Sequence, residues 1–224
     1  MSKVAIIITG DVRNCSTKDV IVRQFEDYDV FCGSYKKHAD YISRIGKVNK
    51  SVLIDPDTDI RFPKGLDKTN MQHNMLQWLH LDNVIHKFKD ELLEYDVLLK
   101  FRFDCRVTGG EFKETLKNLR AEQGVVHSMG DCSFYAEPRT FFRAFEDFYD
   151  TIQDGFLHKN DMDNSFEKSW KSEAAFTENL KIKQLVDKRP LFFRFSLDRG
   201  GYHKVTADGN KRLYDGTKLL GKFT

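Results

Sequence analysis

The sequence predicts an α/β fold in which a mixed, mostly parallel central sheet is flanked by helices. Short apolar segments at residues 4–9, 28–32 and 97–103 have the character of strands that are buried on both faces of a sheet. A long segment at 71–92 repeats its apolar residues with helical spacing. Strands and helices therefore alternate along the chain, which is the pattern of an α/β sandwich.

Composition favours one folded domain and excludes several classes of protein. The chain has 224 residues, which fits one large domain better than two small ones. Hydrophobic residues make up 40% of it, including 19 Phe, so it can build a substantial core and is not disordered overall. Lys and Arg number 36 against 34 Asp and Glu, and this balance gives no reason to expect a nucleic-acid or membrane-surface protein.

The amino terminus and the cysteines predict a soluble protein of a reducing compartment. The apolar run at residues 4–8 is too short for a signal peptide, and no segment has the length of a membrane span. The four cysteines are scattered and form no CxxC pair, so neither a zinc site nor a disulfide framework is expected. We therefore expect a cytoplasmic location, in the host cytoplasm if the protein is viral.

The first half of the chain divides into five elements. The strand at 4–9 is broken by Gly10, and a helix at 17–27 follows with Ser16 or Thr17 as its N-cap. Strands at 28–32 and 52–54 end at Gly33-Ser34 and at Asp55-Pro56. The helix at 71–92 comes next, with one apolar face formed by Met71, Met75, Trp78, Leu81, Ile85, Phe88 and Leu92. Gln77 on this helix faces either a ligand or solvent.

The second half begins with the strand at 97–103 and continues in shorter elements. We expect a helix at about 111–121, strands at 125–128 and 133–136, and a helix that starts with Pro138 at N1 and presents aromatic residues as far as Ile152. The polar stretch 153–171 is expected to be a loop. A helix capped by Ser172 runs to about Leu185, a strand covers 191–197, and the tail 206–224 is either a hairpin or loosely docked.

Charged residues stand at the end of the strand 97–103. This strand is expected in the middle of the sheet, and ligands of open α/β sheets bind at the carboxyl ends of such strands. Arg102, Asp104 and Arg106 alternate with apolar residues there. Asp104 can hold a divalent cation through its oxygens. An Asp–Arg salt bridge that closes the strand end fits the same residues equally well.

Three segments of the chain resemble the motifs of one known family. The segment from Ile6 to Asn14 resembles an opening strand followed by Ser/Thr-Gly-x-x-Arg-Asn. The segment from Glu94 to Asp104 resembles a Tyr-Asp-hydrophobic-hydrophobic-basic-x-Arg-x-Asp motif. The segment 129–136 resembles an Asp-x-x-Phe-x-small strand before an aromatic-rich helix. In this order, between residue 4 and about 185, the motifs resemble those of glycosyltransferase-like proteins found in bacterial capsule and lipopolysaccharide loci and in large viruses.

The resemblance implies a GT-A-like, Rossmann-like fold and an enzyme that takes a nucleotide-sugar donor, a glycan acceptor and Mn²⁺ or Mg²⁺. Residues 1–224 would form one domain, with a nucleotide-binding half at about 1–107, an acceptor half at about 108–205 and a tail at 206–224. The family's usual Asp-x-Asp is Arg102-Phe103-Asp104 here. Arg102 is therefore a candidate to neutralise the donor diphosphate directly.

The resemblance also assigns roles to individual residues, each with a simpler alternative. Nucleotide contacts would be Thr9, Gly10, Asp11, Arg13 and Arg102, although the first four also fit an ordinary strand-to-helix turn. Metal ligands would be Asp104 and His203, although His203 also fits a surface position beside a Gly-Gly turn. The candidate catalytic carboxylates are Asp131 and Glu173, although Asp131 also suits a turn and Glu173 also complements a helix dipole.

The predicted function is transfer of a sugar from a nucleotide sugar to a glycan hydroxyl in polysaccharide biosynthesis, with metal assistance. A sugar nucleotidyltransferase is an alternative, but Gly10-Asp11-Val12-Arg13 lacks the Gly-rich loop that such an enzyme needs. A catalytically inactive relative that binds glycans or partners is another, and the replaced first Asp supports it. A methyltransferase would need a Gly-rich first turn, which is missing. The small size also suggests a homo-oligomer that supplies acceptor-binding surface.

Overall fold

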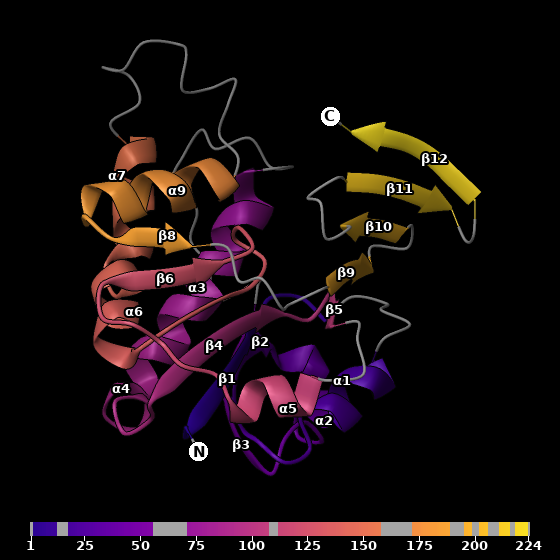
Figure 1. The fold of residues 1–224 in the computed structure, drawn as a ribbon, viewed down its shortest axis with the longest axis horizontal. Helices are drawn as coiled ribbons and strands as arrows, with labels where there is room; N and C mark the ends of the chain where they lie inside the picture. Colours follow the sequence, from indigo (N-terminus) through magenta and orange to yellow (C-terminus); the bar gives the residue numbers. More distant parts are fainter. Residues whose placement is uncertain are drawn as a thin grey trace.

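The computed structural model describes residues 2–12, 18–55, 71–107, 112–157, 172–188, 195–198, 202–205, 211–215 and 218–223. These residues form a seven-stranded sheet covered by helices on both faces, and a second, five-stranded sheet beside one end of it (Figure 1). The predicted fold class, a mixed and mostly parallel sheet flanked by helices, is confirmed. No described helix is long and apolar enough to cross a membrane.

The large sheet has the strand order β3-β2-β1-β4-β7-β6-β8. Its strands are β1 (Val4–Thr9), β2 (Asp29–Tyr35), β3 (Val48–Ile54), β4 (Val97–Arg102), β6 (Val125–Ser128), β7 (Phe134–Ala136) and β8 (Val186–Lys188). Only β7 runs antiparallel to its neighbours, β4 and β6. The strand β4 occupies the centre of the sheet, as predicted.

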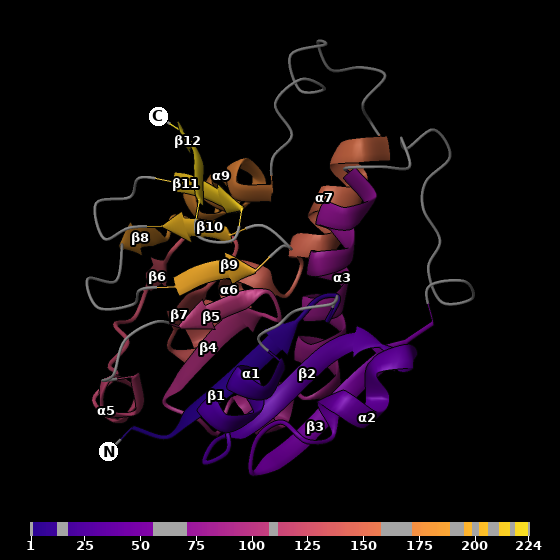
Figure 2. The ribbon, with the colours of Figure 1, turned by 90° about the vertical axis from the view of Figure 1, so that its right-hand side faces the viewer.

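Helices bury the two faces of the sheet in two separate cores. Along β1, Ala5 and Ile7 face one core, whereas Ile6 and Ile8 face the other, because successive side chains of a strand point to opposite faces. The first core is covered by α3 (Met71–Lys87), α6 (Pro138–Phe145), α7 (Phe148–Leu157) and α9 (Ser172–Ile182). The second is covered by α1 (Lys18–Gln24), α2 (Ala39–Ile42) and α5 (Phe112–Lys117). Figure 2 shows α3 and α7 side by side behind the sheet.

Aromatic rings fill the first core. Trp78 of α3 stacks on Phe145 and Phe176 with centroids 6.1 and 6.2 Å away, and meets Phe148 edge-on at 4.7 Å. Phe134 of β7 packs against the same rings. Offset and edge-to-face aromatic pairs add to the stabilisation from their buried area. This cluster ties α3, α6, α7 and α9 to the central strands.

The second sheet is antiparallel and has the order β12-β11-β10-β9-β5. Its strands are β5 (Cys105–Val107), β9 (Phe195–Asp198), β10 (Tyr202–Val205), β11 (Lys211–Asp215) and β12 (Lys218–Phe223). The chain leaves the large sheet at Arg102 and enters the second sheet at Cys105 after a two-residue turn. Of the two expectations for the tail, the hairpin is confirmed, because β11 and β12 pair antiparallel.

Two predicted helices are each divided in the structure. The helix predicted at 71–92 is interrupted at Phe88, whose φ of −118° and ψ of 22° are not helical, and α4 (Lys89–Leu92) follows. The helix predicted from Pro138 ends at Phe145, and α7 begins at Phe148. Glu137 caps α6 by accepting from the backbone N–H groups of Arg139 and Thr140. The apolar spacing continues across both breaks, so the pattern alone did not reveal them. The loop predicted at 153–171 is wrong at its start, because α7 extends to Leu157.

Strand boundaries differ where tertiary contacts override local preference. The predicted stop at Gly33-Ser34 is wrong, because β2 continues to Tyr35, and β3 begins at Val48. Glycine suits position 33 of this strand because α3 lies very close. A Cβ atom there would meet the carbonyl oxygen of His80 and come within 2.9 Å of Val84 Cγ2. Other elements were not predicted, namely η1 (Lys36–His38), α2, β5, β8 and β10. The helix α9 ends at Ile182, and Gln184 reverses the chain with a φ of 53°.

Candidate functional site

The carboxyl ends of β1 and β4 meet at the point where the chain connections diverge. From β1 the chain runs to β2 and β3 on one side, and then crosses over to β4 on the other side. Open α/β sheets bind ligands in the crevice outside such a switch point. The register places Thr9 beside Arg102 on one flank and beside Gly33 on the other. The structure thus brings together Thr9, Gly10, Asp11 and Arg102, four of the five predicted nucleotide contacts.

Gly10 leaves an open space at the end of β1. Its φ is +114°, and a Cβ atom built there would meet no atom of the described residues within 4 Å, apart from its chain neighbours. The backbone is held by two hydrogen bonds, from Gly10 N to Gly33 O at 3.0 Å and from Ser34 Oγ to Gly10 O at 2.7 Å. Next to it, Asp11 Oδ1 lies 2.9 Å from His38 Nε2. Gly10 is therefore held in position by β2, with room at its Cβ position among the described residues.

Arg102 and Asp104 form a buried ion pair at the end of β4. Arg102 donates from Nε to Asp104 Oδ1 at 2.9 Å and from Nη2 to Asp104 Oδ2 at 2.6 Å. The side chains are 12% and 4% exposed. Burial alone would lower the pKa of Arg102, but the charge of the Asp104 carboxylate and its hydrogen bonds with the guanidinium raise that pKa above its usual value. Of the two interpretations of this strand end, the geometry matches the Asp–Arg salt bridge.

Asp131 joins this ion pair from the turn before β7. Its Oδ2 lies 4.0 Å from Arg102 Nη1 and accepts from Gln77 Nε2 at 3.3 Å. Its carbonyl oxygen accepts from Lys100 Nζ at 2.6 Å and from Gln77 Nε2 at 3.2 Å. Gln77, of the two orientations left open, faces this cluster and not solvent, since it is 8% exposed. Asp131 is thus a buried member of the strand-end cluster formed by Arg102, Asp104, Asp131, Gln77 and Lys100.

Lys100 is a buried cation that sequence reasoning gave no role. Its side chain is fully buried, and Nζ lies 5.4 Å from the ring centroid of Trp78 and 5.2 Å from that of Phe134. Burial lowers its pKa to about 8, although the charge of Asp131 acts in the opposite direction. A lysine in the middle of an apolar strand was the feature of the sequence that could have identified it.

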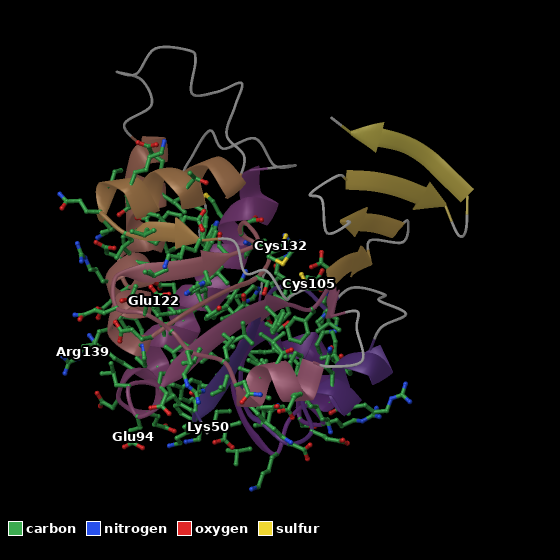
Figure 3. All side chains as sticks on the ribbon, in the orientation of Figure 1. Lys50, Glu94, Cys105, Glu122, Cys132 and Arg139 are labelled. Carbon is green, nitrogen blue, oxygen red and sulfur yellow. The ribbon has the colours of Figure 1, made fainter. Side chains whose placement is uncertain are left out.

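Two thiols border the cluster where the two sheets meet. Cys132 Sγ lies 3.7 Å from Arg102 Nη1 and donates to Asp131 Oδ1 at 3.4 Å, and Cys105 Sγ donates to the carbonyl of Cys132 at 3.7 Å. Figure 3 shows Cys105 and Cys132 together at this end of β4, far from Glu122 and Arg139. A hydrogen bond with Cys105, together with burial, raises the pKa of Cys132 well above its usual value. Neither thiol is in a disulfide, and the raised pKa of Cys132 keeps that thiol protonated at neutral pH.

Two buried polar side chains beside the cluster have no hydrogen-bond partner among the described residues: Thr9, through its Oγ1, and His80, through both ring nitrogens. Thr9 is fully buried and His80 is 1% exposed. The His80 ring meets the ring of Tyr35 edge-on at 4.8 Å. Burial lowers the pKa of His80 to about 4, against the attraction of Asp11, so the imidazole is neutral. Sequence reasoning missed His80, because a histidine on a helix carries no motif.

Three predicted site residues are placed only in part or not at all. Arg13 lies outside the described residues. Glu173 is the second residue of α9, and the side chain lies outside what the structure describes. His203 belongs to β10, where the register sets it opposite Leu197, which in turn pairs with Cys105. The backbone of His203 is therefore two strands away from the residue that follows Asp104.

The described residues do not match a divalent-metal site. They contain no group of three His, Cys, Asp or Glu side chains placed to hold a metal ion. Both oxygens of Asp104 accept from Arg102 instead. This strand end thus has two carboxylates with a guanidinium between them. That Asp104 and His203 are metal ligands stays a prediction.

No protein-family model matches this sequence, and no curated protein matches it. Similar solved structures include the apo form of the glycosyltransferase GlyE of Streptococcus pneumoniae TIGR4, which is 13% identical with a TM-score of 0.41 over 84% of this chain and 45% of that one. A protein of Desulfovibrio desulfuricans G20 described as a nucleotide-diphospho-sugar transferase is 11% identical, with a TM-score of 0.41 over 85% of this chain and 80% of its own. A glycosyltransferase involved in the glycosylation of the major capsid of PBCV-1 is 9% identical, with a TM-score of 0.40 over 84% of this chain and 82% of its own. This chain therefore spans less than half the length of GlyE.

Proposed function

We propose that this protein is a glycosyltransferase that moves a sugar from a nucleotide-sugar donor to a hydroxyl of a glycan. The observation that carries the proposal is the strand-end cluster, in which two buried cations, Lys100 and Arg102, lie at the switch point of the sheet beside the open loop at Gly10. A diphosphate needs positive charge, and the nucleoside attached to it needs a loop that permits close approach.

The chemistry of the reaction explains why such cations are needed. Breaking the bond between the sugar and the diphosphate leaves negative charge on the departing oxygen. Positive groups that are already fixed in place stabilise that charge without reorganisation in the transition state. Arg102 is fixed by its two hydrogen bonds to Asp104, and its remaining N–H groups on Nη1 and Nη2 can donate to a phosphate oxygen.

The loop after β1 is the proposed contact for the nucleoside. Thr9, Gly10 and Asp11 line the carboxyl end of the strand next to Arg102, and the fully buried hydroxyl of Thr9 has no partner among the described side chains. Arg13 would extend this contact. A donor lying across the switch point would therefore place its diphosphate toward β4 and its nucleoside toward β1 and β2.

The two predicted catalytic carboxylates take different parts in this proposal. Asp131 is buried and engaged with Gln77 and Arg102, so it is suited to hold the cluster in position. Glu173 lies in the first turn of α9, a helix anchored through the contact of Phe176 with Phe134 at 5.2 Å. An inverting transferase needs a base for the acceptor hydroxyl, and Glu173 is the proposed base.

Metal assistance stays a prediction for this site. For Mn²⁺ or Mg²⁺ to bind, Asp104 would have to exchange Arg102 for the ion, with His203 as a second ligand. The binding experiment therefore includes arms with and without Mn²⁺.

The proposal is tested by thermal unfolding in the presence of UDP, GDP, dTDP or CMP. A ligand that binds only the folded state raises the free energy of unfolding by RT ln(1 + [L]/Kd), which is about 2.7 kcal/mol at 100 times Kd. We expect one nucleotide to raise Tm, and Gly10→Ala to abolish the shift. Gly124→Ala is the matched control, since Gly124 also has a positive φ and open surroundings, and it should keep the shift. No shift with any of the four nucleotides would refute the proposal.

A catalytically inactive relative that binds glycans or partners is the second candidate, and the pairing of Asp104 with Arg102 is the observation that favours it. The two candidates differ in turnover. If wild-type protein binds a nucleoside diphosphate, release of that diphosphate from its sugar conjugate, with and without glycan acceptors, distinguishes them. Release that is lost in Glu173→Gln supports the transferase, whereas tight binding without release supports the inactive relative.

A further inference from the structure

The position of Arg102 between two buried carboxylates identifies which cation belongs to this strand end. Asp104 is 3% exposed and Asp131 is 4% exposed. The guanidinium reaches Asp104 with Nε and Nη2 and approaches Asp131 with Nη1. Its opposite ends are therefore directed at the two acidic side chains, and its charge compensates both.

The formal charges within the strand-end cluster already balance. Lys100 and Arg102 carry two positive charges, and Asp104 and Asp131 carry two negative ones. A divalent ion prefers oxygen ligands at about 2.0–2.6 Å. The oxygens of Asp104 instead have guanidinium nitrogens at 2.9 and 2.6 Å, so an ion that used them would have to displace Arg102. A displaced guanidinium would have to leave a site in which its side chain is 12% exposed.

We infer that Arg102 is the resident cation of this site. Its guanidinium fills the position between Asp104 and Asp131 that a divalent ion would need, and it faces the diphosphate of a bound nucleotide sugar in place of Mn²⁺ or Mg²⁺. The identity of that ligand rests on the proposed function. The occupation of the metal position by Arg102 rests on the geometry alone, so the two can be tested separately.

If Arg102 occupies the metal position, the Arg102→Asp variant should gain a site for a divalent ion. Replacing the guanidinium with a carboxylate removes the cation and sets three carboxylates, from residues 102, 104 and 131, around the space that it filled. Three converging carboxylates are a strong ligand set for a hard divalent ion. The wild-type protein should lack affinity for Mn²⁺ at this site, and the variant should gain it.

The test measures Mn²⁺ binding by electron paramagnetic resonance and calorimetry, without nucleotide. Four proteins are compared: wild type, Asp104→Asn, Arg102→Asp, and Arg102→Asp combined with Asp104→Asn. We expect wild type and Asp104→Asn to have the same Mn²⁺ affinity. Arg102→Asp should bind Mn²⁺ at least about 100-fold more tightly than wild type. The double variant should lose that gain in affinity. Tm with and without Mn²⁺ gives a second readout, because a metal that binds only the folded state raises Tm.

Two outcomes overturn the inference. In the first, wild type binds Mn²⁺ and Asp104→Asn weakens that binding at least about tenfold, or 1.4 kcal/mol. That result would show that the ion displaces Arg102. The second is a folded Arg102→Asp variant with no gain in affinity. If Arg102→Asp does not fold at any Mn²⁺ concentration, the comparison of wild type with Asp104→Asn still decides the matter. If no nucleotide raises Tm but the Mn²⁺ results are as expected, the proposed transferase function is refuted, whereas the role of Arg102 as the resident cation stands.

Discussion

Arg102 and Asp104 lie two positions apart in the sequence, and the guanidinium of Arg102 donates to both carboxylate oxygens of Asp104. The intervening turn at Phe103–Asp104 is where the chain passes from the large sheet to the second one. Phe103 is buried in the core on the opposite face, so the turn is anchored by an apolar side chain while the two charged ones meet. The ion pair therefore closes the strand end and presents a fixed cation at the switch point.

The first prediction concerns the coupling between these two side chains. Removing one partner of a buried pair leaves the other uncompensated and costs about 3–5 kcal/mol, whereas replacing both with apolar residues costs much less. We expect Arg102→Met to destabilise strongly, because it removes the guanidinium that donates to both oxygens of Asp104 and approaches Asp131, and Arg102→Met/Asp104→Leu to recover most of the loss. Urea unfolding of the two single variants and the double variant gives the coupling free energy. Additive effects would mean that the pair does not act as a unit.

The second prediction uses the neutral state of His80. Burial lowers its pKa from 6.5 to about 4, so the unfolded chain binds a proton more readily than the folded one between these pH values. Titration of His80 therefore has no effect on the free energy of unfolding above about pH 6.5. As the pH drops toward 4, its titration in the unfolded chain lowers that free energy by about 3 kcal/mol. His80→Leu should flatten this part of the curve of unfolding free energy against pH.

An unchanged slope in His80→Leu would contradict the burial of a neutral imidazole at this position. The comparison is between wild type and His80→Leu at each pH, so carboxylates remote from residue 80 that titrate in the same range affect both proteins alike and cancel in the difference.

The third prediction concerns the close contact between β2 and α3. A Cβ atom at Gly33 would meet the backbone carbonyl of His80, which cannot move without shifting the helix. We expect Gly33→Ala to destabilise by at least about 2 kcal/mol through overpacking. Gly124→Ala has open space around it and bears only the cost of its positive φ, so it should destabilise less. Equal losses in chemical denaturation would show that α3 is not in tight contact with β2.

The fourth prediction separates stability from binding at Thr9. Its hydroxyl is buried without a partner among the described residues, and such a group costs about 1–3 kcal/mol. Thr9→Val has nearly the same shape and removes the hydroxyl, so it should raise Tm of the free protein. If Thr9 contacts the donor, the same variant should reduce the Tm shift produced by the nucleotide that wild type binds. Thr9→Ser, which keeps the hydroxyl, should retain that shift. A full shift in Thr9→Val would remove Thr9 from the proposed donor contacts.

Much of the fold follows from local patterns in the sequence. The apolar run at Val4–Thr9 and the mixed run at 97–103 predict strands, and the place of the second of them, β4, at the centre of the sheet is confirmed. The helical repeat through Trp78 predicts the core face of α3. These patterns are informative because burial acts on each side chain through its own position in a helix or strand. Boundaries such as those at Phe88 and Gly33 depend on packing between elements and were not predicted.

The sequence by itself determined where polar chemistry stands along the chain. It placed Arg102 and Asp104 after a central strand, Thr9, Gly10 and Asp11 after the first strand, and Asp131 in a turn, and the fold brings them to one end of the sheet. It left two interpretations of Asp104 open, a metal ligand or an ion-pair partner, because both use the same residue types at the same spacing.

Only the tertiary structure decided which partners these side chains have. Lys100 meets the carbonyl of a residue 31 positions away, and Gln77 meets Asp131 across 54 positions. His80 is neutral because strands from elsewhere in the chain bury it. The charge state and the partners of a buried polar group depend on every group around it in space, and side chains remote in sequence supply most of them.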